Sequence, residues 1–262
     1  MRNPVAIDTI SSVRLLIYNI RYATGVGPAF HLPVPGAGYL RSNPAVLRKI
    51  TEFIKQEDPD VVGLIEVDTG SIRSGMVNQA DVIARSLGHY STYECKYGVA
   101  SFNQLVPIVR KQSNAFLAAP RVRGERFHYF DTGFKRLIIE LELDEVAIFL
   151  VHLSLKFRHR QYQLRYLHEL VSKTKKPVIV AGDFNTYWGE HEIYLFMRAS
   201  GLTSANLKGL PSYPSRNPRK ELDFILYSRE IHVDRFSIPD IRLSDHLPLI
   251  CDFTIQTEGS HG

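Results

Sequence analysis

The chain has 262 residues, of which 44% are hydrophobic and 23% are charged. That length allows one large hydrophobic core, and the ordinary charge content excludes wholesale disorder. The formal net charge of +5 suits an anionic substrate but does not select one. The two cysteines, Cys95 and Cys251, lie far apart without a CxxC motif, which argues against a disulfide framework or a zinc ribbon.

The N-terminal segment, residues 1–12, is polar and lacks the apolar core of a secretory signal. No apolar run approaches the length that crosses a membrane. We therefore expect a cytoplasmic monomer. We also expect a single domain over residues 1–262, with an ordered core from about residue 12 to residue 256.

The first elements in chain order predict the start of an α/β fold. Residues 13–20 have the aliphatic and aromatic content of a strand. Asn43 and Pro44 predict a helix start, and apolar residues then recur at helical spacing until Asp58-Pro59. Residues 61–65 form the next buried strand, which ends at Glu66. This strand–helix–strand order is typical of α/β proteins.

The rest of the chain is predicted to contain more strands and two more helices. Six strands with hairpin-like spacing are expected over residues 89–97, 105–110, 115–118, 127–130, 135–143 and 146–153. Later strands are expected over residues 177–181, 222–227, 232–238 and 249–255, and helices over residues 158–173 and 193–199. Mixed sheets with helices outside them predict a two-sheet α/β sandwich.

Three stretches are too long to be simple turns. Residues 21–42 are rich in glycine and proline, residues 68–78 carry Arg73, and residues 204–220 contain three prolines and basic side chains. Long ordered loops beside strand ends often carry binding residues.

Polar side chains recur where the predicted strands begin or end. Each one alone is explained as a cap, a turn or a core histidine, but six strand ends share the feature. The residues are Asn19, Glu66, His152, Asp183 with Asn185, Asp223, and Asp245 with His246. Function at one end of a sheet is how α/β folds build sites. Oxygen ligands without cysteine indicate magnesium or manganese rather than structural zinc.

The order of these motifs resembles the endonuclease/exonuclease/phosphatase superfamily, particularly its pancreatic deoxyribonuclease-like and sphingomyelinase-like branches. The matching segments are Leu16-Ile17-Tyr18-Asn19-Ile20, Gly63-Leu64-Ile65-Glu66-Val67, Val151-His152-Leu153, Gly182-Asp183-Phe184-Asn185-Thr186, Leu222-Asp223-Phe224-Ile225 and Ser244-Asp245-His246-Leu247-Pro248. The resemblance covers essentially the whole chain. It implies a four-layered α/β sandwich, with two mixed sheets packed face to face and helices outside, and a Mg²⁺-dependent hydrolase in which Mn²⁺ is the alternative ion.

The resemblance also implies a role for each residue. Glu66 would be the principal metal ligand, helped by Asn19 and Asp245. Asp183 would orient or deprotonate the attacking water, and Asn185 would hold a phosphate oxygen. His246 would contact the phosphate, and Asp223 would orient a catalytic histidine, most simply His152.

Two positions bear on the branch within this superfamily. Its members usually have glutamine before the metal-binding glutamate, whereas this chain has Ile65, so a supporting amide is lost. The central strand ends in His152, as in the deoxyribonuclease and sphingomyelinase branches, and not in the tyrosine of exonuclease III-like repair enzymes. This difference argues against an abasic-site repair enzyme.

The substrate stays open between alternatives. A phosphodiesterase acting on nucleic acid would use Arg121, Arg123 and residues 216–220 along the phosphates, with Tyr39 and Tyr213 stacking on bases. Arg73, Tyr213 and Asn185 are the substrate-binding residues expected.

The second alternative is a phosphatase or phosphodiesterase acting on a lipid or inositol head group. The apolar residues Phe30, Leu32, Val34 and Tyr39 of residues 21–42 would touch a membrane there, although no strong amphipathic anchor is visible. The third alternative is a binding module without catalysis.

Overall fold

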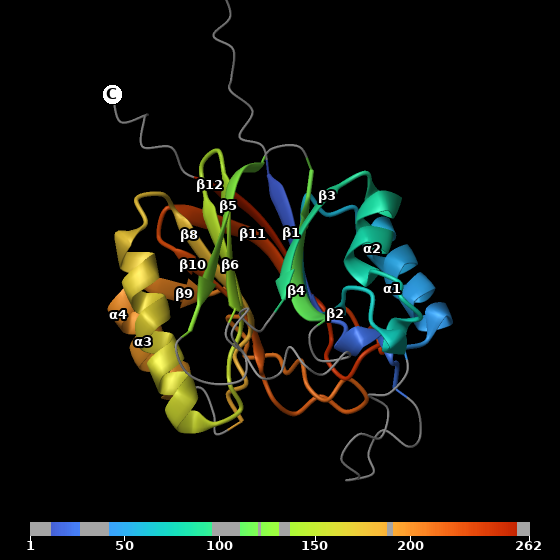
Figure 1. Cartoon of the computed structure of the whole chain (residues 1–262). Coiled ribbons are helices and arrows are strands. Elements are labelled where there is room, and N and C mark those ends of the chain that lie inside the picture. The colour runs from blue at the N-terminus through green and yellow to red at the C-terminus, as the bar shows by residue number, and fades with distance from the viewer. Residues whose placement is uncertain are drawn as a thin grey trace, which may run out of the picture.

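The computed structural model describes residues 12–26, 42–95, 111–119, 122–130, 137–187 and 191–255. Two six-stranded mixed sheets lie face to face, and a pair of helices covers the outer face of each (Figure 1). The predicted four-layered α/β sandwich is confirmed. None of the described helices is long and apolar enough to cross a membrane.

The first sheet has the strand order β11-β12-β1-β2-β4-β3. Its strands are β1 (Val13–Asn19), β2 (Val61–Asp68), β3 (Tyr90–Cys95), β4 (Gln112–Ala118), β11 (Ile231–Ser237) and β12 (Leu249–Ile255). Strands β1 and β2 run parallel, while β12 pairs with the other edge of β1 in the antiparallel sense. Helices α1 (Pro44–Glu57) and α2 (Gln79–Leu87) pack on the outer face (Figure 1).

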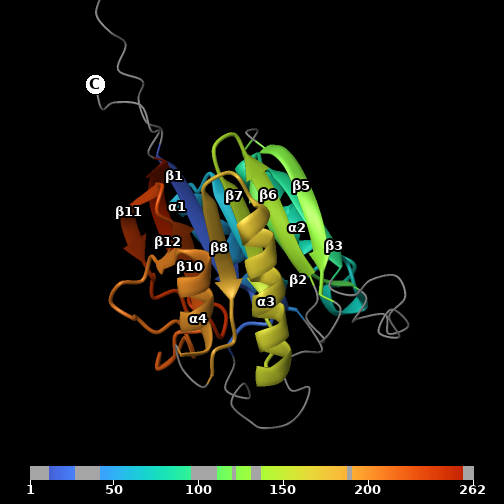
Figure 2. The same cartoon turned by 90° about the vertical axis from the view of Figure 1, so that its left-hand side faces the viewer.

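The second sheet has the order β5-β6-β7-β8-β10-β9. Its strands are β5 (Val122–Tyr129), β6 (Leu137–Leu143), β7 (Ala147–His152), β8 (Val178–Asp183), β9 (Leu202–Ser204) and β10 (Asp223–Ser228). Strands β7 and β8 run parallel and β10 pairs antiparallel with β8. Helices α3 (Phe157–Lys173) and α4 (His191–Ser200) cover this sheet, as Figure 2 shows from their side.

Three apolar layers hold the sandwich together. The inner layer, between the sheets, includes Ile17, Phe116 and Leu150, all fully buried. The two outer layers lie under α1 with α2 and under α3 with α4. A Cβ on Gly63 of β2 would lie 2.6 Å from Ile17 Cδ1 and 2.9 Å from Leu150 Cδ1, so the glycine lets the sheets approach closely there.

Two elements are absent from the sequence prediction. Helix α2 has a capping Asn78, whose side chain accepts from Ala80 and Asp81, and it ends at a left-handed Gly88. These signals were present in the sequence but the helix is short. Strand β9 has only three residues and forms because β10 offers it an edge. The strand predicted over residues 105–110 lies outside the described residues, as do Phe30, Leu32, Val34, Tyr39 and Arg121.

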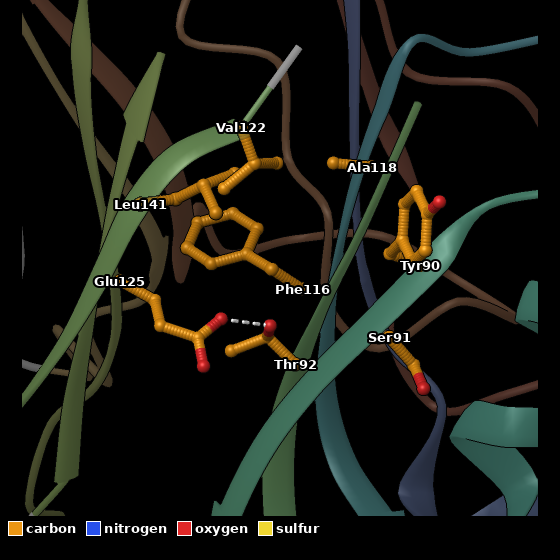
Figure 3. Close-up of a pocket in the computed structure, with 8 residues that line it drawn as sticks. All are labelled: Tyr90, Ser91, Thr92, Phe116, Ala118, Val122, Glu125 and Leu141. Carbon is orange, nitrogen blue, oxygen red and sulfur yellow. Dashed lines mark hydrogen bonds between the residues drawn. The ribbon is translucent and has the colours of Figure 1, made fainter. Parts of the chain in front are cut away.

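A cavity of about 330 Å³ opens between the two sheets near β3 and β5 (Figure 3). Its lining includes Tyr90, Phe116 and Leu141, and a hydrogen bond between Thr92 and Glu125 joins β3 to β5 across the gap. Tyr90 and Ala118 lie level with Val61, at the start of β2. The cavity is therefore at the end of the sandwich away from the polar strand ends.

Gly63 and Gly182 both lie very close to neighbouring atoms, and we expect a methyl group at each to lower the free energy of unfolding by a different amount. Gly182 has a φ of +141°, and a Cβ there would lie 2.0 Å from the carbonyl oxygen of Val151. Backbone cannot yield as side-chain tips can, so Gly182→Ala should lower the free energy of unfolding by about 3 kcal/mol or more. Gly63→Ala meets only side-chain ends and should cost about 1 kcal/mol. Urea denaturation of both variants measures this, and equal losses would contradict the explanation.

Candidate active site

The polar strand ends meet at one end of the sandwich. Asn19 ends β1, His152 ends β7 and Asp183 ends β8, while Asp223 begins β10 directly opposite Asp183. His152 is likewise level with Asp183 in the parallel pair of β7 and β8. The two sheets each contribute a parallel pair whose carboxyl ends point the same way, and this places the side chains together.

Asp183 lies at the centre of the group. Its Oδ1 accepts the backbone N–H of Asn185 at 3.0 Å, and its Oδ2 accepts from Asn19 Nδ2 at 3.1 Å. The Nε2 atoms of His152 and His246 lie 3.3 Å and 3.9 Å from Oδ2. The carboxylate is 2% exposed, so these partners offset its burial and fix its direction.

The backbone around Asp183 is held in an unusual conformation. Asn185 has a φ of +54°, which asparagine tolerates better than most residues, and its Nδ2 donates to the carbonyl oxygen of Leu153 at 3.0 Å. Phe184 between them is fully buried and packs edge-on against Phe224 at 5.4 Å. Asp183 and Asn185 therefore both lie on the site side.

His246 forms a buried pair with Asp223. Its Nδ1 lies 2.7 Å from Asp223 Oδ2, which also accepts from the Ser212 hydroxyl at 2.6 Å. We expected Asp223 to orient His152, and this expectation is wrong because residues 244–248 fold over the start of β10. The N–H of Leu247 donates to the backbone carbonyl oxygen of Ser212, and the N–H of Ser215 donates to the backbone carbonyl oxygen of Asp245; these two bonds fix the loop.

Burial and charge act against each other on this pair. Burial alone lowers the pKa of His246, but the carboxylates of Asp223 and Asp183 and the hydrogen bond to Asp223 raise the pKa well above its ordinary value. Burial also raises the pKa of Asp223, and the imidazole partly offsets that effect. We infer an imidazolium paired with a carboxylate at neutral pH.

Glu66 faces the same group because β2 is irregular at its end. The register between β2 and β4 shifts between Leu64 and Val67, and Glu66 has a φ of +56°. Such bulges re-aim a side chain. Glu66 Oε1 lies 3.9 Å from His152 Nε2, and the side chain is 14% exposed. The half-buried carboxylate of Glu66 therefore borders the site from the side of the first sheet.

Asp245 completes the acidic part of the site. Burial raises the pKa of its carboxyl; His246 and Arg21 counteract this, whereas the nearby Glu66 adds to it. Its Oδ2 lies 3.7 Å from Arg21 Nε. Two carboxylates that raise each other's energy in this way fit a divalent cation, whose charge relieves the repulsion. Glu66 and Asp245, with Asn19 beside them, are suited to hold one.

A second set of ligand atoms also lies close together. Asp183, Asp223 and His246 each offer an atom within 4.8 Å of the others. However, the Nδ1 of His246 already faces Asp223, and a protonated imidazole has no free lone pair for a metal. We therefore favour Glu66 and Asp245 as the metal ligands.

Two residues of the site were not singled out in the sequence. Arg21 is 5% exposed, its N–H donates to Asn19 Oδ1 at 3.2 Å, and its guanidinium approaches Asp245. It begins a turn, η1 (Arg21–Ala23), whose three residues all have positive φ. Ser212 supports Asp223. The only sequence signal for Arg21 was its position two residues after Asn19, and Ser212 lies in a loop without a motif.

Arg73 is placed differently from the prediction. We expected it to bind substrate, but its side chain is 1% exposed and its Nη2 lies 2.9 Å from the fully buried Asp68. Its guanidinium also lies over the Tyr22 ring, 3.7 Å from the centroid. The Arg73 charge is used inside the fold, in the short turn η3 (Ile72–Ser74), to neutralise Asp68.

Tyr213 lies where a substrate-binding residue is expected. Its ring centroid is 4.9 Å from that of His246 and 5.8 Å from that of Tyr187. Lys220 Nζ lies 4.9 Å from the Tyr187 ring centroid, and Arg216 and Arg219 are exposed on the same loop. An aromatic and basic wall therefore borders His246.

Comparison with known proteins gives a match to a family and to solved structures of the same fold. The model of the Endonuclease/Exonuclease/phosphatase family matches residues 16–246. A UPF0294 protein of Erwinia tasmaniensis is 35% identical over 118 residues, 44% of this chain and 42% of that protein. The chain thus matches less than half the length of that relative.

Solved structures share the fold over nearly the whole chain. An endonuclease/exonuclease/phosphatase family protein from Bacteroides thetaiotaomicron has a TM-score of 0.72 at 14% identity, covering 94% of this chain and 99% of that one. The human Nocturnin catalytic domain with bound sulfate has a TM-score of 0.66 at 22% identity, covering 94% and 95%.

The pair of His246 and Asp223 predicts a titration that needs no substrate. In protein freed of divalent ions, His246 should stay protonated well above pH ~6.5. Its stabilising effect is full below that pH and is lost as the pH rises through the folded pKa. Asp223→Asn should lower that pKa, because the Asp223 charge that favours the protonated imidazole is removed. NMR titration of the imidazole tests this, with Asp240→Asn on the surface as the control; an unchanged pKa in Asp223→Asn would remove the proposed pairing.

Proposed function

Because the chain belongs to the endonuclease/exonuclease/phosphatase family, we propose that it is a divalent-metal-dependent phosphoesterase that hydrolyses a phosphate ester with an activated water. The observation that carries the proposal is the convergence on Asp183. A buried carboxylate lies within 4 Å of two imidazoles, and Glu66, which also influences Asp245, lies 3.9 Å from one of them. These groups are of the types that would serve as acid, base and metal ligand in such a reaction.

Glu66 and Asp245 would hold the metal, with Asn19 beside them. A bound Mg²⁺ or Mn²⁺ neutralises charge on the phosphate and on the leaving oxygen. The Asn19 side chain already donates to Asp183, and its Oδ1 accepts from the backbone N–H of Arg21. We therefore assign Asn19 mainly to positioning Asp183 relative to the metal ligands Glu66 and Asp245.

The remaining residues would act on the water and on the phosphate oxygens. Asp183, fixed through Asn185 and Asn19, would orient the water and accept its proton. His246, kept protonated by Asp223, would donate a hydrogen bond to a phosphate oxygen and would then transfer its proton to the leaving group. Asn185 uses one Nδ2 hydrogen on Leu153 and has a second for the phosphate. His152 would stabilise the same negative charge from the other side.

The residues above act on the phosphate, so selectivity for the alcohol esterified to it would depend on the exposed side chains around the site. Exposed Arg216, Arg219 and Lys220 beside Tyr213 suit a polyanion, which keeps nucleic acid as a candidate. Exposed aliphatic side chains at the same end, such as Ile72 and Leu207, favour the lipid or inositol head group alternative.

Metal dependence is the first test of the proposal. Hydrolysis of bis-p-nitrophenyl phosphate, with p-nitrophenyl phosphate assayed beside it for a monoesterase, should require Mg²⁺ or Mn²⁺. Glu66→Ala should weaken metal affinity, so that high Mg²⁺ partly restores turnover, whereas Glu230→Ala in an exposed turn should behave as wild type. Full turnover in excess chelator would rule out the metal mechanism.

Substitutions of the acid and base give the second test. His246→Ala and Asp183→Asn should each lower the turnover of the folded protein by roughly two to four orders of magnitude. Both residues have buried partners, so the thermal midpoint should also fall, and turnover is compared at a temperature where each variant is folded. The exposed His232→Ala is the matched control and should change neither quantity. His152 is 1% exposed, so turnover and midpoint must be measured on the same samples of His152→Ala. A large drop in midpoint with normal activity of the folded fraction would make His152 structural.

A further inference from the structure

Large apolar side chains are exposed at the end of the sandwich that carries the site. Ile72 and Met76 follow β2, Leu155 and Phe157 follow β7, and Leu207 and Leu210 precede β10. Their exposed fractions run from 42% for Leu210 to 81% for Leu207. In both Figures 1 and 2 the start of α3, the loop after β9 and the segment after β2 lie at the lower end of the molecule.

The opposite end of the sandwich has a different surface. Its turns, residues 58–60, 88–89, 144–145, 174–177 and 229–230, consist of charged residues, threonine, histidine, glycine and proline. Tyr90, at the start of β3, is the large exposed side chain beside these turns, and it carries a hydroxyl. Most of the exposed aliphatic side chains among the described residues therefore lie at the site end, although Leu195 on α4 and Val82 on α2 are exposed as well.

Basic residues alternate with the apolar ones in two of the three segments. Leu155, Lys156, Phe157 and Arg158 are consecutive and all exposed. Residues 207–210 repeat the pattern with Lys208 between Leu207 and Leu210. Binding to an anionic lipid surface requires apolar side chains that insert among the acyl chains. It also requires lysine or arginine side chains at the depth of the lipid phosphates.

Hydrogen bonds of buried side chains fix the backbone of the two segments that carry Leu155 and Leu207, and this keeps their apolar side chains exposed. Arg160 Nη1 donates to the carbonyl oxygens of Ser154 and Leu155 at 2.6 Å and 3.0 Å, and its Nε donates to Glu192 at the start of α4. Arg160 is fully buried, so the ends of β7 and α4 are fixed against each other.

The second segment is held by Asn206. Its side chain accepts from the N–H of Leu210 and donates to the Leu210 carbonyl and to Glu221. Leu207 and Leu210 are thus presented by a closed turn, and their exposure is built into the fold.

We propose that the site end docks on an anionic phospholipid surface, so that the phosphate ester of a lipid head group reaches Asp183 and His246. This inference rests on the proposed phosphoesterase function and names its substrate class. The alternation of Leu155, Lys156, Phe157 and Arg158 beside the site carries it. The acidic Asp240 at the same end does not oppose it, because it is paired with Arg242 at 2.7 Å.

Flotation with vesicles tests the docking directly. The full chain should bind vesicles of phosphatidylcholine with phosphatidylserine more tightly than phosphatidylcholine alone. Leu155→Ser/Phe157→Ser should weaken binding by about tenfold or more, because two side chains no longer leave water. Tyr90→Ser, at the opposite end, is the matched control and should bind as wild type.

Charge is tested in the same assay. Lys156→Glu/Lys208→Glu should reduce binding to anionic vesicles by about fivefold or more per lysine. Lys175→Glu/Arg229→Glu makes the same change in net charge at the opposite end and should reduce binding much less. Equal losses from the two double variants would show nonspecific attraction and would overturn the docking surface.

Hydrolysis of a water-soluble ester separates this inference from the proposed function. The apolar and basic variants should retain wild-type turnover of bis-p-nitrophenyl phosphate, since none of these side chains belongs to the site. Vesicle binding with the expected variant pattern, but no hydrolysis of any ester, supports the docking surface and removes the chemistry. Normal ester hydrolysis without vesicle binding overturns the docking surface alone.

Two other occupants would give different results. If a single-stranded oligonucleotide binds, with loss in the lysine variant only, and vesicles do not bind, the surface is for nucleic acid and the lipid proposal is overturned. If the chain dimerises in sedimentation experiments, Leu155→Ser/Phe157→Ser abolishes the dimer and vesicles do not bind, the surface joins two copies and the lipid proposal is again overturned.

Discussion

At the site end, the carboxylate of Asp183 connects the two sheets through a polar group. It belongs to β8 in the second sheet, yet it accepts a hydrogen bond from Asn19 at the end of β1 in the first. Between Asp183 and the Thr92–Glu125 hydrogen bond at the opposite end, the contact of the sheets is apolar, and it is close-packed at Gly63. Such packing tolerates little sliding. The relative position of the sheets therefore sets how far Glu66 lies from His152 and Asp183.

Burying so much charge in one place is costly unless every group has a partner. Asp183 has two amide donors and two imidazole neighbours, and Asp223 has Ser212 and His246. Glu66 lies 3.9 Å from His152 and Asp245 lies 3.7 Å from Arg21, but the charge of Glu66 also makes ionisation of Asp245 less favourable. A fold keeps such a repulsion where a cation is bound, which is why these two carboxylates weigh most in assigning the metal-binding edge.

Much of the fold and most of the site could be predicted because the relevant signals are local. Asn43-Pro44 begins α1 as expected, and Asn19, Glu66, His152 and Asp183 lie at the ends of apolar runs that are strands. The errors concern contacts between distant segments. Asp223 pairs with His246 and not with His152 because residues 244–248 fold over Ser212, which no spacing along the chain shows. Arg73 carries a charge in a glycine-rich loop, and only the buried Asp68 beside it explains its inward position.

Strand β1 lies between β2 and β12, so the first of the described strands completes its pairing with the last of them. A chain still leaving the ribosome has made Asn19, Glu66 and Asp183 long before residues 249–255 exist. Until then one edge of β1 is unpaired, and His246 has not reached Asp223. The order of synthesis thus makes β12 a condition for the assembled site, and a protein shortened before β12 lacks both that strand and the support that it gives to β1.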